Sequence, residues 1–323
     1  MKKIFVSAAY PGSSIDRLAQ KYDVHVFDKD RLPTAEELAR EAQRSSALIT
    51  TVSDVIDKNI IDLCPNLKII SNSGVGYENV DIPYATERGI FVTNTPNVLT
   101  ETTADMAWAL MVCVARRIVE ADSYMRSGQF KCWKPTLMLG VNIHGKTLGV
   151  LGMGRIGTAV ARRASGFNMK IIYNNRSRNE QAEKAVGAGF VDFPTLLRES
   201  DYIVVTTPLT KETKGRFGLP EFRQMKRDSI IINVGRGPVI KEAELAEALR
   251  QGLIWGAGLD VFENEPKVDP ELLKQENVVL APHMASASWE TREEMIGMAI
   301  QSVELALSGE VPLYLVNSEV LSS

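Results

Sequence analysis

The stretch Thr147-Leu148-Gly149-Val150-Leu151-Gly152-Met153-Gly154-Arg155-Ile156-Gly157 decides the fold of this chain. Residues 147–151 predict a buried strand, and the periodicity of residues 155–167 predicts a helix. Between them, the glycines fit the pattern G-x-G-x-x-G. The first glycine allows a tight turn, the second lets the backbone approach a pyrophosphate, and the third lets helix and strand pack closely. The motif therefore predicts that a dinucleotide binds at the helix N-terminus, over Gly152, Gly154, Arg155, Ile156 and Gly157.

A second glycine pattern lies just upstream and is misleading. Residues 140–147 match the P-loop string G-x-x-x-x-G-K-[ST]. A P-loop needs a strand before it and a helix after it, so that its N–H groups and the helix dipole converge on phosphates. Here Lys146 and Thr147 open a strand instead. A nucleotide triphosphatase is therefore excluded.

Short β-branched runs alternate with helical patterns along the whole chain, which predicts α/β architecture with parallel sheets. With 323 residues and about 150 residues per domain, two domains are expected. The first set of predicted strands covers residues 3–8, 24–28, 47–52, 67–72 and 90–94. The second set covers residues 147–151, 170–174, 202–206, 229–234, 256–261 and 278–280. The fold class is therefore two Rossmann-like, doubly wound parallel sheets.

The domain boundaries follow from two helical stretches. Residues 100–128 predict one long helix or two abutting ones, which would join the two strand-rich regions. The last predicted helix, from about residue 288 to 307, is expected to cross back and complete the first region. The prediction is a discontinuous substrate-binding domain of residues 1–99 and 288–323, with an inserted dinucleotide-binding domain of residues 100–287.

Composition excludes several classes of protein. There are 37 Lys and Arg residues against 40 Asp and Glu, a net charge of -3, so no basic surface is available for nucleic acid. The longest apolar stretch, residues 106–115, is too short to span a bilayer. The apolar run near the N-terminus ends at Pro11-Gly12, so the N-terminus is not interpreted as a signal peptide. Three cysteines without C-x-x-C spacing suit reduced thiols. A cytoplasmic enzyme without membrane or nucleic-acid partners is expected, and with only three histidines no metal site is expected.

The residues after the second strand of the dinucleotide region indicate which cofactor binds. NAD enzymes place a carboxylate there to bind the ribose 2′-hydroxyl. This chain instead has Asn175, Arg176 and Ser177, followed by Arg178. A carboxylate would repel a 2′-phosphate, whereas a guanidinium binds its oxygens through a planar fork of donors. NADP(H) is therefore predicted as the preferred cofactor, with NAD(H) as the alternative.

Three strand ends of the second region carry candidate catalytic groups. Arg236 lies in a glycine-flanked turn after residues 230–234, Glu265 follows residues 257–262, and His283 follows residues 278–282. Ligands of open α/β sheets bind at this carboxyl edge. His283 is the one histidine of three at such a strand end, and a neighbouring carboxylate would orient its ring and favour its charged form. These three strand ends predict reduction of a carbonyl compound by hydride transfer. His283 would be the proton donor and Arg236 the positive group beside the carbonyl.

With the glycine motif and these strand ends in place, the chain resembles the D-isomer-specific 2-hydroxyacid dehydrogenase family. The resemblance covers essentially the whole chain and is carried by residues 152–157, 233–237, 258–266 and 280–283 in that order. Residues 133–135 and 175–177 are similar to the branch of glyoxylate/hydroxypyruvate reductases and 2-ketogluconate reductases. It implies a flavodoxin-like substrate domain. One departure is Ala285, where the family often has glycine.

The resemblance also implies a role for individual residues. Arg236 would bind the substrate carboxylate and carbonyl, Glu265 would hydrogen-bond the imidazole, and His283 would protonate the carbonyl oxygen. The N–H groups of Val75 and Gly76 would bind the carboxylate. Trp133 would reach the neighbouring subunit, which implies a homodimer. Positions that would line the cofactor cleft are Thr103, Thr207, Pro208, Val234 and Asp260.

The expected activity is NADPH-dependent reduction of small 2-keto acids, first of all glyoxylate and hydroxypyruvate, to D-2-hydroxy acids. One alternative is a reductase of longer keto acids such as 2-ketogluconate. Another, from a different class, is a dinucleotide-sensing protein similar to the family's transcriptional corepressors. The presence of Arg236, Glu265 and His283 together favours the enzyme.

Overall fold

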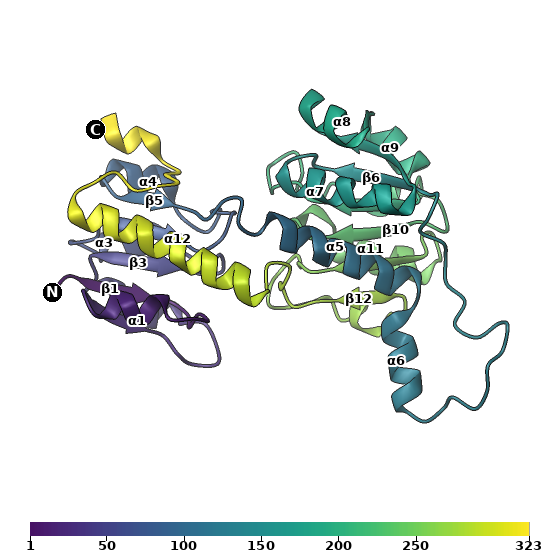
Figure 1. The fold of residues 1–323 in the computed structure, drawn as a ribbon, viewed down its shortest axis with the longest axis horizontal. Helices are drawn as coiled ribbons and strands as arrows, with labels where there is room; N and C mark the ends of the chain where they lie inside the picture. Colours follow the sequence, from purple (N-terminus) through teal and green to yellow (C-terminus); the bar gives the residue numbers. More distant parts are fainter. Residues whose placement is uncertain (323) are drawn as a thin grey trace. The chain divides into compact units, whose positions relative to one another are not determined.

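A computed structural model describes residues 1–322 of the chain. The chain forms two compact units (Figure 1). The first comprises Met1–Leu99 and the segment from Ala287 onward, and the second comprises Thr100–Ser286. Each unit is built around one parallel sheet, which confirms the predicted α/β class of two Rossmann-like domains.

The first unit contains a five-stranded parallel sheet of order β2-β1-β3-β4-β5, the doubly wound order of flavodoxin-like folds. Its strands are β1 (Lys3–Val6), β2 (Asp23–Val26), β3 (Ala47–Thr50), β4 (Ile69–Asn72) and β5 (Phe91–Thr93). The helices before the second unit are α1 (Ser14–Ala19), α2 (Ala35–Ala42), α3 (Lys58–Asp62) and α4 (Ile82–Glu87). Beyond the second unit come α12 (Trp289–Ser308) and a short 3-10 helix, η4 (Ser318–Ser322).

Helix α12 contributes one side of the core of the first unit. The Ser288 hydroxyl caps the helix by accepting a hydrogen bond from the backbone N–H of Thr291 at 3.1 Å. One face of the sheet, with Ile4 and Ile49, packs on Ile296 and Val303 of this helix. The opposite face has its own core under α2, α3 and α4. Both faces of the sheet are therefore covered, which explains why the inner strands β1, β3 and β4 are almost wholly buried, whereas the edge strand β2 is not.

The second unit contains a seven-stranded parallel sheet of order β12-β11-β10-β9-β6-β7-β8. Its strands are β6 (Thr147–Leu151), β7 (Lys170–Asn174), β8 (Gly189–Phe190), β9 (Tyr202–Val205), β10 (Ile230–Asn233), β11 (Gly256–Leu259) and β12 (Val278–Leu280). The strand order reverses at β6, beside β9, and the glycine motif follows β6 directly. Open α/β sheets bind ligands at such a switch point. Strand β8 was not predicted because it is two exposed residues long.

Helices cover both faces of the second sheet. They are α5 (Thr100–Ala115), α6 (Ile118–Arg126), α7 (Arg155–Ala164), α8 (Glu180–Val186), α9 (Phe193–Glu199), α10 (Leu219–Phe222) and α11 (Glu242–Arg250), with 3-10 turns η1 (Ser165–Phe167), η2 (Gly237–Val239) and η3 (Leu272–Lys274). The predicted helical stretch of residues 100–128 is two helices. They separate at Arg117, whose φ of 53° lies in the left-handed region and cannot continue an α-helix. Among the described residues, none of the helices combines the length and apolarity needed to cross a membrane.

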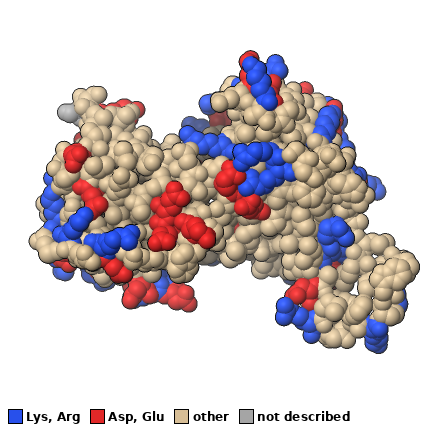
Figure 2. Space-filling model, viewed as in Figure 1, with Lys and Arg blue, Asp and Glu red and all other residues tan. Residues whose placement is uncertain are grey.

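Positive and negative side chains are interspersed on both units in the face that Figure 2 shows. Neither unit presents a broad field of positive charge there, in keeping with the near-balanced composition. The segment that follows α6 is largely uncharged in the same view.

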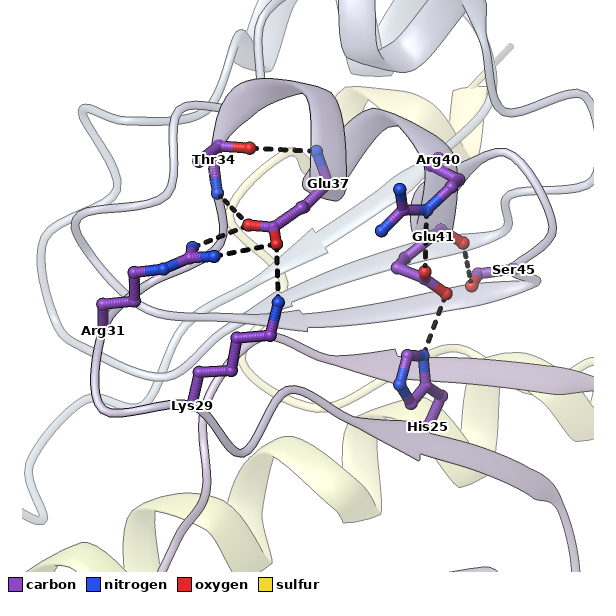
Figure 3. Close-up of polar contacts among 8 residues, drawn as sticks. All are labelled: His25, Lys29, Arg31, Thr34, Glu37, Arg40, Glu41 and Ser45. Atoms are coloured by element: carbon purple, nitrogen blue, oxygen red, sulfur yellow. Dashed lines mark hydrogen bonds and ion pairs between the residues drawn. The ribbon is translucent and has the colours of Figure 1, made fainter.

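Helix α2 begins with a capping box (Figure 3). The Thr34 hydroxyl accepts from the N–H of Glu37 at 3.2 Å, and the Glu37 carboxylate accepts from the N–H of Thr34 at 2.9 Å. Arg31 and Lys29 also bind this carboxylate, at 2.7 and 2.9 Å. Hydrogen bonds from Arg31, Thr34 and Lys29 hold the pKa of Glu37 well below its ordinary value.

Candidate functional site

The turn after β10 presents Arg236 at the carboxyl edge of the second sheet. The Asn233 side chain shapes this turn: its oxygen accepts from the N–H of Gly235 at 3.1 Å, and its amide donates to the carbonyl of Arg236 at 3.0 Å. At Gly237 a Cβ would lie 1.8 Å from the carbonyl oxygen of Phe262, so only glycine fits. This close contact brings the Arg236 turn against the segment that carries Glu265.

Glu265 and His283 form a hydrogen-bonded pair. Nδ1 of His283 lies 2.8 Å from Oε2 of Glu265, and Oε1 of Glu265 accepts from the N–H of Phe262 at 2.9 Å. Burial works against the charged form of Glu265, but the hydrogen bond and charge of His283, the Phe262 N–H and the Arg236 charge outweigh it. The pKa of Glu265 therefore lies below its ordinary value. Both carboxylate oxygens are bonded, so the ring of His283 is held in one orientation.

The backbone around His283 is held by Asp260. The N–H of His283 donates to the carbonyl of Asp260 at 2.8 Å, and the Asp260 carboxylate accepts from the N–H groups of Met284 and Ala285 at 2.7 and 2.9 Å. His283 has a φ of 52°, a left-handed conformation that costs a non-glycine residue about 1 to 2 kcal/mol. Burial raises the pKa of Asp260, against the two N–H bonds that lower it. Asp260, expected from the sequence only as part of the cofactor cleft, thus directly supports the histidine segment.

The glycine motif has the geometry of a phosphate-binding turn. Gly152 has a φ of 105°, and a Cβ there would lie 2.7 Å from the nitrogen of Thr207. A Cβ on Gly157 would lie 2.2 Å from the carbonyl oxygen of Gly152, whereas a Cβ on Gly154 would meet no atom within 4 Å. Gly154 is also the N-cap of α7 and supplies no side-chain cap. The turn therefore leaves room over Gly154 and the first residues of α7, Arg155 and Ile156, where a pyrophosphate fits.

The residues after β7 divide into bonded and exposed groups. The Asn175 side chain accepts from the N–H of Met153 at 2.6 Å, and so ties the strand end to the glycine motif. Arg178 is paired with Glu183 at 2.8 Å. Arg176 and Ser177 are exposed beside them. No carboxylate stands at Asn175, so the chain lacks the acid that NAD enzymes place there.

The other predicted cofactor residues lie on neighbouring elements of the second unit. Gly152 and Gly235 both approach the backbone of Thr207, so the ends of β6, β9 and β10 meet around this residue. Val234 is buried and donates its N–H to Val205, Pro208 follows Thr207, and Thr103 is buried on α5. Among the described residues, no group of three or more His, Cys, Asp or Glu side chains is arranged to hold a metal ion.

Val75 and Gly76 belong to the first unit and follow β4. Two amide side chains bind this loop: Nδ2 of Asn72 donates to the carbonyl of Gly76 at 2.6 Å, and Nδ2 of Asn94 donates to the carbonyl of Val75 at 2.8 Å. The sequence reasoning missed both asparagines. Their positions at the ends of β4 and β5, where ligands of such sheets bind, are the signal that could have found them.

Known proteins match this chain over its full length. The sequence model described as "D-isomer specific 2-hydroxyacid dehydrogenase, NAD binding domain" matches residues 108–285. A glyoxylate reductase of Thermococcus litoralis is 47% identical over 325 residues, covering 99% of this chain and 98% of the relative.

Solved structures are also similar to this chain. A protein from Thermus thermophilus has a TM-score of 0.92 and 40% identity, covering 97% of this chain and 99% of its own. An NADPH-dependent glyoxylate/hydroxypyruvate reductase from Sinorhizobium meliloti, in complex with NADP and malonate, has a TM-score of 0.84 and 33% identity, covering 99% and 97%. The chain is thus an oxidoreductase with an NAD(P)-binding domain, and it belongs to the D-isomer specific 2-hydroxyacid dehydrogenase family.

Proposed function

We propose that this protein reduces small 2-keto acids, above all glyoxylate and hydroxypyruvate, to D-2-hydroxy acids with NADPH. The observation that carries the proposal is the His283–Glu265 pair beside Arg236 at the carboxyl edge of the NAD(P)-binding sheet. Relatives across the full length are named glyoxylate reductases, which supports the substrate class.

His283 is the general acid in this proposal. A bound reduced nicotinamide supplies the hydride, and the carbonyl oxygen of the substrate then needs a proton. Because Glu265 lies at Nδ1 of His283, the opposite nitrogen, Nε2, is left to deliver that proton. The charged carboxylate of Glu265 orients the ring and stabilises the imidazolium form.

Arg236 recognises the carboxylate and the carbonyl of the substrate in this proposal. The N–H groups of Val75 and Gly76 are proposed to bind a carboxylate as well. A guanidinium presents several N–H donors in a planar fork, which matches a carboxylate or a carboxylate with its neighbouring carbonyl. The positive charge also polarises the carbonyl that accepts the hydride. Arg236 thus combines binding with activation of the substrate.

Preference for NADP(H) follows from the end of β7. A neutral side chain, Asn175, occupies the position at which a carboxylate would repel a 2′-phosphate, and Arg176 and Ser177 are exposed next to it. Arg178 is already engaged with Glu183. We assign the 2′-phosphate to Arg176 and Ser177, with Asn175 holding the glycine motif. The Sinorhizobium relative was solved with NADP, which supports this assignment.

Two arginine variants test the cofactor proposal. Arg176→Ala is expected to raise KM for NADPH about tenfold or more and to leave KM for NADH unchanged. The variant loses a hydrogen bond to the charged 2′-phosphate, and only NADPH carries that phosphate. Arg178→Ala is the matched control, since its guanidinium is bound to Glu183. Equal effects on NADPH and NADH in Arg176→Ala, or a wild-type preference for NADH, would contradict the proposal.

The reaction is tested by measuring the rate of NADPH oxidation with a panel of 2-keto acids. Glyoxylate and hydroxypyruvate are expected to give the highest kcat/KM. A higher value for 2-ketogluconate would reassign the substrate to longer keto acids. Dinucleotide binding without turnover of any keto acid would favour a sensing protein and contradict the enzyme.

A homodimer and a cytoplasmic location complete the proposal. Apolar side chains of α6 and the segment after it are exposed on the second unit, among them Ile118, Val119, Phe130 and Trp133, the last with 76% of its surface exposed. Exposed apolar surface of this kind marks an interface. Light scattering is expected to give a dimer mass, and a monomer would refute it. The free cysteines Cys64, Cys113 and Cys132 suit a reducing compartment.

A further inference from the structure

The loop that follows β4 has three consecutive carbonyl groups bound by donors from within the first unit. The carbonyl of Gly74 accepts from the N–H of Thr95 at 2.9 Å. Nδ2 of Asn94 donates to the carbonyl of Val75 at 2.8 Å, and Nδ2 of Asn72 donates to that of Gly76 at 2.6 Å. The three carbonyls are therefore held by backbone and amide donors on β4 and just after β5.

A planar trans peptide fixes its N–H direction through its carbonyl. The carbonyl of one residue and the N–H of the next belong to the same plane and point to opposite sides. The groups that bind the carbonyls of Gly74 and Val75 therefore lie on one side of these two peptides. The N–H groups of Val75 and Gly76 point to the opposite side. Within residues 1–322, neither of these two N–H groups donates a hydrogen bond. They are left to bind an anion.

The loop has little freedom to adopt another arrangement at its start. A Cβ on Gly74 would lie 2.2 Å from a methyl carbon of Val52, so the chain is pressed against the loop that follows β3. Asn72 is itself held, because its Oδ1 accepts from Thr50 at 3.3 Å and from Asn79 at 3.2 Å. Asn94, by contrast, acts on the loop through one hydrogen bond, and that bond controls the peptide whose N–H belongs to Gly76.

We propose that Asn94 is a positioning residue for substrate binding: its amide holds the Val75 carbonyl so that the N–H of Gly76 points at the carboxylate of the 2-keto acid. This inference rests on the proposed function, because it assumes that the loop binds that carboxylate. Asn94 touches no substrate atom in this role. It determines how well the loop binds the anion, and takes no part in hydride or proton transfer.

The test compares Asn94→Ala with Asn277→Ala. Asn277 is a matched amide: it is half-buried like Asn94, and its Nδ2 also donates to one backbone carbonyl, that of Trp255, at 2.8 Å. Asn94→Ala is expected to raise KM for glyoxylate about tenfold, the value of one hydrogen bond to a charged group, with kcat changed less than threefold and KM for NADPH unchanged. Asn277→Ala is expected to leave all three constants near wild type.

A structural defect would give a different pattern. If Asn94→Ala lowers kcat and alters KM for NADPH as much as KM for glyoxylate, or leaves KM for glyoxylate unchanged, the proposal is wrong. Asn94→Asp removes the amide donor and also introduces a negative charge, so it is expected to raise KM for glyoxylate further. If Asn94→Ala gives no folded protein by thermal melting, Asn94→Ser, which retains a polar side chain too short to span the same bond, is measured against the same criteria.

Oxalate binding separates this proposal from the proposed reaction. Titration calorimetry with oxalate measures anion binding without turnover. If the wild type reduces no keto acid, the proposed reaction fails, but about tenfold weaker oxalate binding by Asn94→Ala still supports the role of Asn94. Equal oxalate affinity of the two proteins, or no binding to the wild type, overturns it.

Discussion

Two histidine–glutamate pairs with nearly the same geometry occur in the two units. In the first unit, Nδ1 of His25 lies 2.9 Å from Oε2 of Glu41 (Figure 3); in the second, Nδ1 of His283 lies 2.8 Å from Oε2 of Glu265. Each carboxylate also has an arginine nearby, Arg40 in the first pair and Arg236 in the second. The electrostatics are alike too: burial raises the pKa of each glutamate, but the histidine and the arginine outweigh it and the pKa is lowered.

The pairs differ in what holds them. His25 lies within the regular edge strand β2, with 59% of its side chain exposed, and its partner Glu41, half-buried on α2, has 22% of its side chain exposed. His283 follows β12 at the carboxyl edge, keeps 34% exposed, and adopts a left-handed backbone. Asp260 binds the N–H groups of the two residues that follow His283.

This comparison teaches that an imidazole–carboxylate pair is not by itself a catalytic site. In the pair proposed to be catalytic, His283 follows a strand at the carboxyl edge and Asp260 holds the backbone behind it, so the free ring nitrogen can face a substrate position. Histidines paired on an ordinary strand surface are a common form of solvated ion pair, worth little to stability. The differences between the two pairs therefore lead to separable predictions.

The largest expected effect comes from removing each histidine. His283→Ala should lower kcat for glyoxylate about a hundredfold or more, because general acid catalysis is worth about 10² to 10⁴. His25→Ala, its counterpart in the first unit, should leave kcat within about twofold. Steady-state kinetics checks both, and a near-wild-type rate for His283→Ala would refute its assignment as the acid.

Replacing each arginine by lysine tests the positive group. Arg236→Lys should raise KM for glyoxylate and lower kcat together, reducing kcat/KM about tenfold to a hundredfold, since a point charge cannot reproduce the planar fork. Arg40→Lys, beside Glu41, should have no kinetic effect. If Arg236→Lys changed only KM, the arginine would bind substrate without polarising its carbonyl.

The support beneath His283 is tested by Asp260→Asn. An amide offers one acceptor oxygen where the carboxylate offers two, so one of the two N–H bonds from Met284 and Ala285 is lost. We expect kcat to fall about tenfold, and the variant to retain its far-ultraviolet circular dichroism. A kcat equal to that of the wild type would show that the left-handed turn at His283 does not need both hydrogen bonds to Asp260.

The smallest difference between the pairs should be in their contribution to stability. A glutamate whose pKa is lowered on folding stabilises the native state above its ordinary pKa, and this contribution is lost as the pH falls through the lower, native value. Glu265→Gln and Glu41→Gln should each lower Tm at pH 7, and by less at pH 3.5, where the wild-type carboxyls begin to gain protons.

Activity should distinguish the same two variants. At pH 7 the kcat of Glu265→Gln should fall, whereas that of Glu41→Gln should not, because only the first of these carboxylates belongs to the proposed substrate site. Thermal melting and kinetics on the same samples check this. A Tm difference for Glu41→Gln that is larger at pH 3.5 than at pH 7 would contradict the assigned sign.

Much of the site could be predicted because its signals are local. Strand, glycine turn and helix follow one another within residues 147–167, so the turn is readable from spacing alone. Arg236, Glu265 and His283 each lie in the segment that follows a strand, within about six residues of its end, and parallel strands present their carboxyl ends at one edge. Two features have weaker sequence signals: the 2-residue strand β8 and the break between α5 and α6 at Arg117. Neither is marked by a periodic pattern of apolar residues.

By itself, the sequence determined the α/β class, the place of the glycine motif and which histidine stands at a strand end. Only the tertiary structure decided that Asp260 supports the His283 backbone and that Asn94 holds the Val75 carbonyl. These bonds join residues 24 and 19 positions apart across different strand ends, and no local pattern encodes such a meeting. Hydrogen bonds of this kind form only once the parallel strands have brought their ends together. The orientation of the groups that they hold therefore depends on the tertiary structure.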